Sequence, residues 1–184
     1  HGLLAPLAAG ATSVLHPDWP DAETVIRLVA RHRPAAMFSV PTIYRRLLAE
    51  AAGRLTALRG VRRFVSAGER LSKQLVEQWR SALGGELLNL YGMSETFCAC
   101  MMTPPGSSDG ARTGLPFEGV QVELRDERGK PPAPGAPGVL WLRHPAQAQG
   151  YASRPHETEL QFRDGWFCSR DLFSRDAHGH YIHQ

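Results

Sequence analysis

The chain has 184 residues, of which 42% are hydrophobic and 21% charged, and its formal net charge is +3 at pH 7. A chain of this length and balance can bury a sizeable core, which excludes disorder, collagen-like repeats and a disulfide-built miniprotein. No run approaches the roughly 20 uncharged apolar residues of a membrane helix, and the first residues lack the pattern of a secretory signal. We therefore expect a soluble, cytoplasmic protein with no membrane partner.

Cysteine, arginine and histidine positions exclude several further classes. Neither a disulfide framework nor a paired C-x-x-C metal site matches the three cysteines, Cys98, Cys100 and Cys168. The arginines are spread over the whole chain rather than gathered on one stripe, so we expect no nucleic-acid partner. His178, His180 and His183 lack an acidic or cysteine ligand at a useful spacing, which favours surface histidines on a hairpin.

Helix-like and strand-like segments alternate up to about residue 103. Hydrophobic periodicity predicts helices over residues 21–31, 43–52 and 72–83. Strands are expected over residues 36–40, 63–66 and 86–90, the first of them a short buried strand. Such alternation with short loops is typical of a parallel sheet with helices packed on its faces.

The pattern changes after Pro104, where a loop of Pro, Gly, Ser and Asp begins and the helical period disappears. Beyond this loop, short strands are expected over residues 120–125, 139–143, 166–168 and 180–182, with one helix over 155–161. The sequence thus predicts an α/β fold, with a parallel-sheet α/β subdomain over residues 1–110. A small β-rich subdomain is expected over residues 111–184.

One segment combines several chemical groups directly after the strand expected at 86–90. Tyr91, Gly92, Ser94 and Glu95 fall within five residues at the carboxyl end of that strand, where α/β sheets bind ligands. An aromatic ring can stack on a planar base, glycine admits a ligand close to the backbone, a hydroxyl can donate to phosphate, and a carboxylate can hold Mg²⁺. Taken alone, the segment is equally compatible with a structural turn and helix cap.

A second loop leaves the preceding strand through small residues. Ala67 and Gly68 lie there, followed by Glu69. If the two strands are neighbours, these small residues would form a flat slot opposite the Tyr91 ring, although a plain strand-to-helix loop is an alternative. The motifs of P-loop NTPases, dinucleotide dehydrogenases, zinc proteases and esterases do not occur in the sequence.

Taken with the rest of the chain, these loops resemble the adenylate-forming enzymes, which include acyl- and aryl-CoA ligases, adenylation domains of peptide synthetases, and luciferases. Seven motifs follow the order of that superfamily: Phe38–Tyr44, Ser66–Glu69, Tyr91–Glu95, Thr113–Pro116, Gly138–Arg143, Gly150-Tyr151 with Pro155–Thr158, and Gly165–Phe167 leading to Asp171-Leu172. Within the superfamily, the chain is most similar to benzoate-CoA ligase and its relatives.

The resemblance implies an AMP-forming enzyme that joins a carboxylic acid to ATP, releases pyrophosphate, and passes the acyl group to CoA. ATP or AMP, Mg²⁺ and CoA are thus the implied cofactors and co-substrates, and a small or aromatic carboxylic acid is the implied substrate. The implied nucleotide contacts are Ala67, Gly68, Glu69, Tyr91, Gly92, Met93 and Asp171. Tyr91 would stack on adenine, and Asp171 would accept hydrogen bonds from both ribose hydroxyls.

Two catalytic residues and an acyl pocket are implied by the same likeness. Ser94 occupies the position of the usual threonine that contacts the α-phosphate, and Glu95 that of the Mg²⁺ ligand. These roles suit a reaction catalysed by neutralising charge and by positioning. The implied acyl-pocket residues are Val40, Gly68, Met93, Phe97 and Cys98.

The sequence also departs from the family pattern. The Ser/Thr/Gly-rich phosphate loop that ends in Pro-Lys, the Gly-Arg step expected after Tyr181, and the C-terminal domain with its lysine are not in these 184 residues. The usual Thr-Gly-Asp reads Ser169-Arg170-Asp171, and the arginine either crowds the nucleotide or adds charge near it. We therefore expect the middle of the large N-terminal domain of such a ligase, inactive by itself.

Two other functions remain open at this point. The chain could be a truncated, non-catalytic module that binds nucleotide or a partner, or an adenylation domain that serves a carrier protein. Truncation would also uncover an apolar face, so we expect a homo-oligomer formed through that face.

Overall fold

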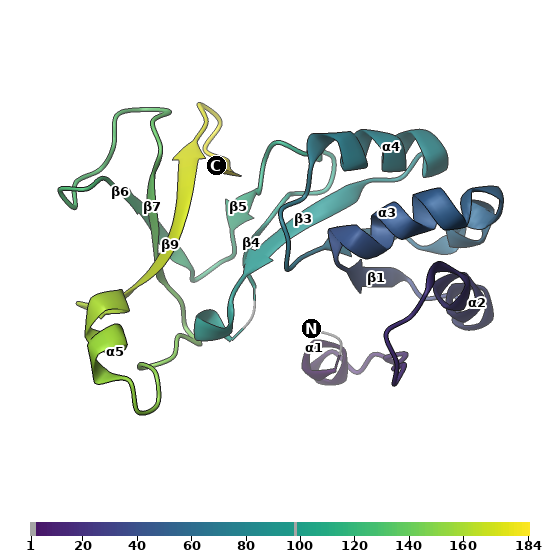
Figure 1. The fold of residues 1–184 in the computed structure, drawn as a ribbon, viewed down its shortest axis with the longest axis horizontal. Coiled ribbons are helices and arrows are strands. Elements are labelled where there is room, and N and C mark those ends of the chain that lie inside the picture. The colour runs from purple at the N-terminus through teal and green to yellow at the C-terminus, as the bar shows by residue number, and fades with distance from the viewer. Residues whose placement is uncertain (1–2, 98) are drawn as a thin grey trace. The chain divides into compact units, whose positions relative to one another are not determined.

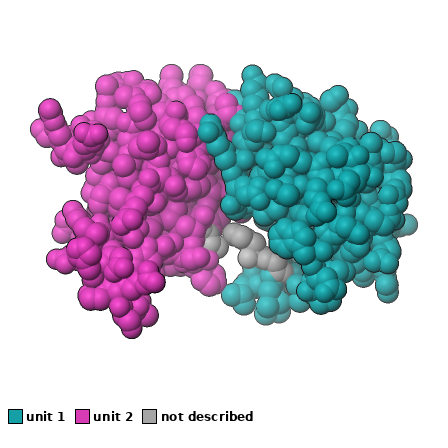
Figure 2. Space-filling view, viewed as in Figure 1, with its two compact units in different colours: residues 1–89, 105–110 teal, residues 90–104, 111–184 magenta. Residues whose placement is uncertain are grey.

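The computed structural model describes residues 3–97 and 99–184. Cys98, expected in the acyl pocket, therefore lies outside the described residues. Figure 1 shows the elements, and Figure 2 colours two compact units, each of which is described here by itself. The first unit comprises residues 1–89 and 105–110, and the second comprises residues 90–104 and 111–184. Residues 90–104 thus group with the β-rich part of the chain.

The first unit contains a parallel sheet covered by helices. Its strands are β1 (Ala36–Ser39), β2 (Arg63–Ser66) and the first part of β3 (Leu87–Gly92), in the order β1-β2-β3. Its helices are α1 (Leu4–Ala8), α2 (Ala22–His32), α3 (Pro41–Glu50), α4 (Lys73–Leu83) and the 3₁₀ helix η1 (Ala52–Gly60). Figure 1 shows α3 and α4 side by side along the strands. Neither α1 nor η1 was predicted from the sequence.

Local capping determines where the main helices begin and end. The Asp21 carboxylate accepts a hydrogen bond from the Thr24 N–H at 2.7 Å and caps α2. Ser72 accepts from the Leu75 N–H at 3.3 Å and caps α4, which confirms the expected start of that helix. The C-terminal end of α4 is Gly84, whose φ of 70° is accessible to glycine at low cost.

Three aromatic rings form the centre of the first core. Tyr44, Phe64 and Trp79 meet edge to face, with Trp79 4.9 Å from each of the other two ring centroids. Tyr44 and Trp79 are fully buried. The Tyr44 hydroxyl donates to the Val65 carbonyl at 2.9 Å, so the ring from α3 is tied to strand β2. Edge-to-face pairs of this kind add to the burial energy and fix the helices against the sheet.

The expectation that residues 36–40 form a buried strand is wrong. Ala36 is exposed, and the Phe38 side chain is 53% exposed. The reason is the position of β1 at the edge of the sheet, where β2 is its one partner among the described strands. Large apolar side chains at the start of the chain are exposed as well, namely Leu3, Leu4, Leu7, Leu15 and Trp19. Self-association through an apolar face stays a prediction.

Residues 105–110 return to the first unit through specific contacts. Ser108 donates its hydroxyl proton to the Leu87 carbonyl at 2.6 Å, and the Ser108 carbonyl accepts from Arg80 of α4. At Gly110, φ is +75°, and an added Cβ would lie 2.5 Å from the Lys73 Cα. Only glycine allows the chain to pass this close to the first turn of α4.

The second unit is a set of mostly antiparallel strands. Its main sheet has the order β10-β9-β7-β6, with β8 paired to β9, and the end of β3 pairs with β4, which pairs with β5. Its elements are η2 (Ser94–Thr96), β4 (Ala99–Met102), β5 (Leu115–Pro116), β6 (Gln121–Arg125), β7 (Gly138–Arg143), α5 (Pro155–Gln161), β8 (Phe162–Arg163), β9 (Trp166–Arg175) and β10 (Tyr181–His183). Helix α5 has the predicted bounds, whereas β9 is much longer than the predicted strand at 166–168.

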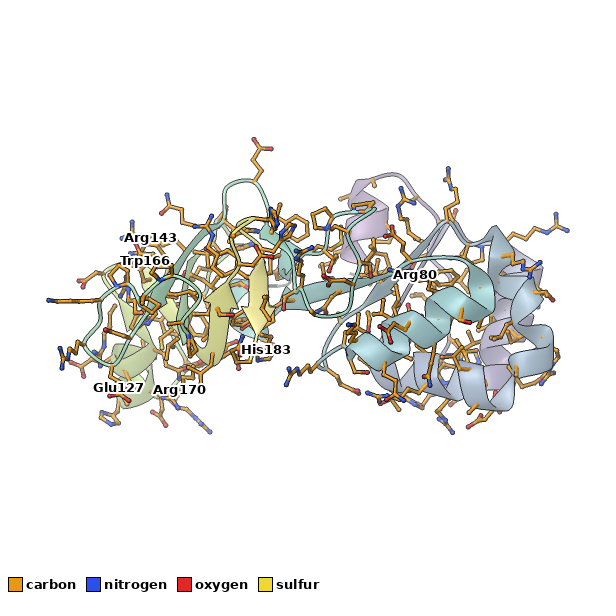
Figure 3. All side chains as sticks on the ribbon, turned by 90° about the horizontal axis from the view of Figure 1, so that it is seen from above. Arg80, Glu127, Arg143, Trp166, Arg170 and His183 are labelled. Atoms are coloured by element: carbon orange, nitrogen blue, oxygen red, sulfur yellow. The ribbon has the colours of Figure 1, made fainter. Side chains whose placement is uncertain are left out.

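The structure confirms the predicted fold class, a parallel α/β part followed by a β-rich part. The second core contains Leu140 and Leu142 of β7 and Phe167 and Phe173 of β9. On the same sheet, Arg143 lies over the Trp166 ring at 4.7 Å, and both are labelled in Figure 3. No helix in the described part of the chain is long and apolar enough to span a bilayer.

A short polar turn joins β9 to β10. The Asp176 carboxylate accepts hydrogen bonds from the N–H groups of His178 and His180, both at 2.9 Å, and from Arg112 Nε at 2.8 Å. Partial removal from water raises the pKa of Asp176, but these bonds outweigh that effect and lower its pKa to about 2. The turn is therefore built around an ionised carboxylate.

Tyr44→Phe should destabilise the protein by about 1–2 kcal/mol, because it removes a buried donor to the Val65 carbonyl. Urea unfolding measures the change. Tyr181→Phe is the matched control, since the Tyr181 hydroxyl makes only a long 3.5 Å contact with the Val122 carbonyl. Equal losses for the two variants would contradict the assigned role of the Tyr44 hydroxyl.

Asp176 should make stability depend on pH in the acid range. Its pKa is lower in the folded protein, so its contribution is present above about pH 4 and disappears as the pH falls towards about 2. Asp176→Asn should therefore show a flatter loss of stability than the wild type between pH 5 and pH 2, measured by thermal unfolding. Parallel curves for the two proteins would refute this prediction.

Candidate functional site

The first unit brings several predicted site residues together in the loop after β2. The Ala67 N–H donates to the Ser39 carbonyl at 3.0 Å, which fixes the start of this loop against β1. At Gly68, φ is +83°, and an added Cβ would lie 3.6 Å from Val40 Cγ1. The two residues that were assigned to the acyl pocket in this unit are therefore neighbours, and Gly68 has a conformation that suits glycine.

Two polar groups lie next to this loop. The Thr42 hydroxyl donates to the Glu69 carboxylate at 2.9 Å and joins the loop to the first turn of α3. Ser66, the last residue of β2, is fully buried, and its hydroxyl has no hydrogen-bond partner among the described residues. An unpaired buried hydroxyl is costly in a protein interior, so this end of β2 has unused hydrogen-bonding capacity.

In the second unit, the end of β3 is irregular. Tyr91 pairs with Met101, whereas Gly92 pairs with Ala99, so Cys100 is an extra residue on β4. Such a bulge bends the strand that has the extra residue, here β4, and changes the direction of its side chains. Phe97, after the short η2 helix, has a φ of +67°, which is unusual for a non-glycine residue.

The predicted Tyr91–Glu95 segment begins on the strand opposite this bulge, and its members differ in exposure. Met93 packs against the second core, while Ser94 is exposed. The Phe97 side chain is 63% exposed. Ser94 and Phe97 are therefore accessible to a ligand, and Met93 mainly contributes apolar packing.

Tyr91 and Asp171, predicted to hold the nucleotide, contact each other directly. The Tyr91 hydroxyl donates to Asp171 Oδ2 at 2.5 Å, and the Tyr91 ring meets Phe173 edge to face at 5.0 Å. Burial and the bond to Asp171 raise the pKa of Tyr91, so the phenol stays protonated and acts as the donor. An aromatic face and a carboxylate thus lie together, although they are 80 residues apart in the chain.

A second bulge places Asp171 at this position. Val139 pairs with Leu172 and Trp141 with Cys168. Leu140 of β7 therefore faces three residues of β9, at positions 169–171. Inside the bulge, the Ser169 hydroxyl donates to the Leu140 carbonyl at 2.9 Å and accepts from the Asp171 N–H at 3.1 Å.

Arg170 is the middle residue of this bulge and has a φ of +65°. The family pattern has glycine at this position, and the left-handed backbone explains the preference for glycine. Arg170 adopts the same backbone at a conformational cost.

His183 is close to the same carboxylate. Its ring stacks flat on Phe173, with centroids 4.7 Å apart and an interplanar angle of 5°, and its Nε2 lies 4.0 Å from Asp171 Oδ1. The expectation of surface histidines is correct for His178, which is exposed, but not for His180 and His183, which are half-buried. The His183 ring packs on Phe173 and the His180 ring lies next to Asp176, which a pattern of three histidines does not reveal.

Glu95 is held by a residue for which no role was predicted from the sequence. The Tyr151 hydroxyl donates to Glu95 Oε1 at 2.7 Å. No group of three or more His, Cys, Asp or Glu side chains in the described residues could hold a metal ion by itself. The Gly150-Tyr151 motif was the available signal for Tyr151, but its contact with Glu95 spans 56 positions and is not visible in a local pattern.

Comparison with known proteins identifies the family. The AMP-binding family, described as "AMP-binding enzyme", matches residues 1–152. The chain therefore belongs to the AMP-binding enzyme family, which confirms the resemblance to adenylate-forming enzymes.

Among the similar curated proteins are ligases of aromatic acids. The 3-hydroxybenzoate--CoA/4-hydroxybenzoate--CoA ligase of Thauera aromatica is 40% identical over 184 residues, covering 100% of this chain and 35% of that protein. The anthranilate--CoA ligase of Pseudomonas aeruginosa is 34% identical, again covering 100% of this chain and 35% of that protein. The chain thus spans about a third of the length of these relatives.

A solved structure has the same fold over nearly the whole chain. The anthranilate CoA ligase AuaEII in complex with anthranoyl-AMP matches with a TM-score of 0.92 and 29% identity, covering 99% of this chain and 35% of that chain.

Arg170→Gly should leave the protein as stable as the wild type or more stable by up to about 1 kcal/mol. Relief of the left-handed strain, about 1–2 kcal/mol, outweighs the greater chain entropy of glycine. Arg170→Val should instead cost at least 1 kcal/mol, because a β-branched residue tolerates positive φ poorly. Urea unfolding of both variants tests the conformation, and a lower stability for Arg170→Gly than for Arg170→Val would contradict it.

Proposed function

We propose that the chain is part of an AMP-forming ligase that joins an aromatic carboxylic acid to CoA, with a hydroxybenzoate-type acid as substrate. The reaction forms an acyl-adenylate from the acid and ATP, releases pyrophosphate, and then transfers the acyl group to the CoA thiol. The observation that carries the proposal is the contact between Tyr91 and Asp171, which joins the two predicted nucleotide residues in one unit. Similarity to the hydroxybenzoate ligase along the entire chain supports the aromatic substrate.

Asp171 and Tyr91 suit an adenosine group. A carboxylate has two acceptor oxygens and can take one hydrogen bond from each ribose hydroxyl, and an aromatic ring can stack on adenine. The Tyr91 hydroxyl donates to Asp171 Oδ2 at 2.5 Å, so ribose must share or displace this donor.

Glu95 is a suitable ligand for Mg²⁺ when phosphate oxygens supply the rest of the coordination sphere, because Mg²⁺ commonly binds through one or two carboxylates plus substrate phosphates. Its Oε1 accepts from Tyr151, while Oε2 has no hydrogen-bond partner in the described residues. Bound Mg²⁺ would neutralise charge on the phosphates. The exposed Ser94 hydroxyl would donate to the α-phosphate and stabilise the charge that develops there.

In the first unit, the neighbouring residues Val40 and Gly68 would contact the acyl group of the acid. Glycine at position 68 places no side-chain carbon beside Val40, where an added Cβ would lie 3.6 Å from Cγ1. The cytoplasmic setting and the CoA acceptor, rather than a carrier protein, are also parts of this proposal.

The test measures ATP–pyrophosphate exchange driven by 3-hydroxybenzoate. The 184-residue chain alone should show no exchange, because it contains no Ser/Thr/Gly-rich phosphate loop. The complete gene product should show exchange that depends on an aromatic acid, and CoA should then yield the thioester. In that protein, Asp171→Asn should raise KM for ATP by about 10–100-fold, the effect of weakening a charge-assisted hydrogen bond worth about 1.5–3 kcal/mol.

Arg170→Gly provides the matched control, since it restores the family glycine beside Asp171 and should bind ATP at least as well as the wild type. Robust exchange by the 184-residue chain would refute the expected inactivity. Acid-independent ATP binding with no exchange by the complete gene product would favour a non-catalytic nucleotide-binding module.

A further inference from the structure

We propose that Tyr151 is a positioning residue that orients the Glu95 carboxylate for the Mg²⁺–ATP complex. This inference rests on the proposed function. It adds a role for Tyr151, a motif residue to which no function was assigned. The evidence is the fixed backbone of Tyr151, the packing of its ring, and the hydrogen bond from its hydroxyl to Glu95.

The backbone of Tyr151 is fixed by helix α5. The Tyr151 N–H donates to Thr158 Oγ1 at 2.8 Å, and the Thr158 hydroxyl donates to the Arg154 carbonyl at 2.8 Å. The preceding residue has to be glycine, because a Cβ on Gly150 would lie 2.4 Å from Thr158 Cγ2. The motif Gly150-Tyr151 with Pro155–Thr158 is therefore a single structural unit that holds Tyr151 against Thr158 of α5.

The ring and hydroxyl of Tyr151 are also defined. The ring packs edge to face on Phe162 at 5.5 Å. The hydroxyl lies 2.7 Å from Glu95 Oε1 and 3.3 Å from Gln161 Oε1. A phenol has a single proton, and the shorter bond to a charged acceptor is the stronger one, so the proton goes to Glu95.

The same segment holds Glu95 at two points. The Ala148 N–H donates to the Glu95 backbone carbonyl at 2.7 Å, and Tyr151 binds the side chain. With both groups fixed, the carboxylate keeps one orientation, and Oε2 remains without a partner in the described residues. Preorganisation of this kind removes the cost of ordering the glutamate when a cation arrives.

Tyr151 remains a donor at neutral pH. A phenol ordinarily ionises at about pH 10, well above neutral pH. The hydroxyl therefore keeps its proton and cannot repel the carboxylate as a phenolate would.

The experiment measures Mn²⁺, as a stand-in for Mg²⁺, bound to the complete gene product in the presence of ATP, by electron paramagnetic resonance of the free ion. Tyr151→Phe should weaken Mn²⁺ binding about tenfold, as is typical when the partner of a metal ligand is removed. Glu95→Gln should weaken it at least as much, and adding Tyr151→Phe to Glu95→Gln should cause no further loss. This non-additivity is specific to a residue that acts through Glu95.

Tyr181→Phe is the matched control, because it also removes one hydroxyl from the second unit and should leave Mn²⁺ binding unchanged. Urea unfolding of Tyr151→Phe should show a loss of no more than about 1 kcal/mol, since the side chain of Glu95 is only half-buried. A purely structural role would lower stability without changing the affinity for Mn²⁺.

The outcomes separate the two proposals. If the wild type binds Mn²⁺ with ATP but Tyr151→Phe matches it within twofold, the role of Tyr151 is refuted while the proposed function stands. An equal loss from Tyr151→Phe in the wild-type and Glu95→Gln backgrounds also refutes it. If the wild type forms no ATP-dependent Mn²⁺ site, the proposed function fails, and this inference fails with it.

Discussion

The geometry of the second unit depends on an interruption of the ladder between β7 and β9. A regular antiparallel pair would place Asp171 on a face set by simple alternation, but one residue of β7 faces three of β9. The Ser169 hydroxyl replaces part of the missing ladder by bonding to the Leu140 carbonyl and the Asp171 N–H. Backbone strain at Arg170 is the cost of this arrangement, and strained positions of this kind cluster at functional sites.

A matching irregularity lies on the other strand that carries site residues. The pairing of β3 with β4 slips by one residue just after Tyr91, at the point where Gly92 leads into the η2 helix. The pairing of β3 with β4 and of β9 with β7 is therefore irregular next to a predicted ligand contact, and the Tyr91–Asp171 bond joins β3 to β9. Regular pairing on both sides of the β7–β9 bulge provides the rigid support that a binding residue needs.

Local signals in the sequence predicted a large part of the fold. Helix α5 and strand β2 have their expected bounds, and the Ser72 cap and the Gly84 end of α4 follow from side-chain chemistry over a few residues. Exposure of β1 could not be predicted, because strand order decides which strand lies at an edge. The length of β9 was missed because Ser169-Arg170-Asp171 looks like a polar loop, yet its side chains and backbone sustain the strand through a bulge.

For the candidate site, motif order predicted residue types but not their mutual contacts. The Tyr91–Asp171 and Glu95–Tyr151 bonds join residues 80 and 56 positions apart, which only the tertiary fold can bring together. His183 was assigned to the surface because a pattern of histidines does not show that its ring stacks on Phe173. Contacts between residues far apart in the chain are therefore the hardest feature to predict from a single sequence.

The route of the chain between the two units has a practical consequence for dividing this protein. The chain leaves the first unit after residue 89, returns for residues 105–110, and leaves again, so neither unit is one continuous segment. A polypeptide that ended at residue 110 would retain every residue of the first unit. The remainder would lose residues 90–104, and with them Tyr91, Glu95 and strand β4. No single peptide-bond cleavage separates the units intact, and a protease nick inside residues 105–110 would damage both.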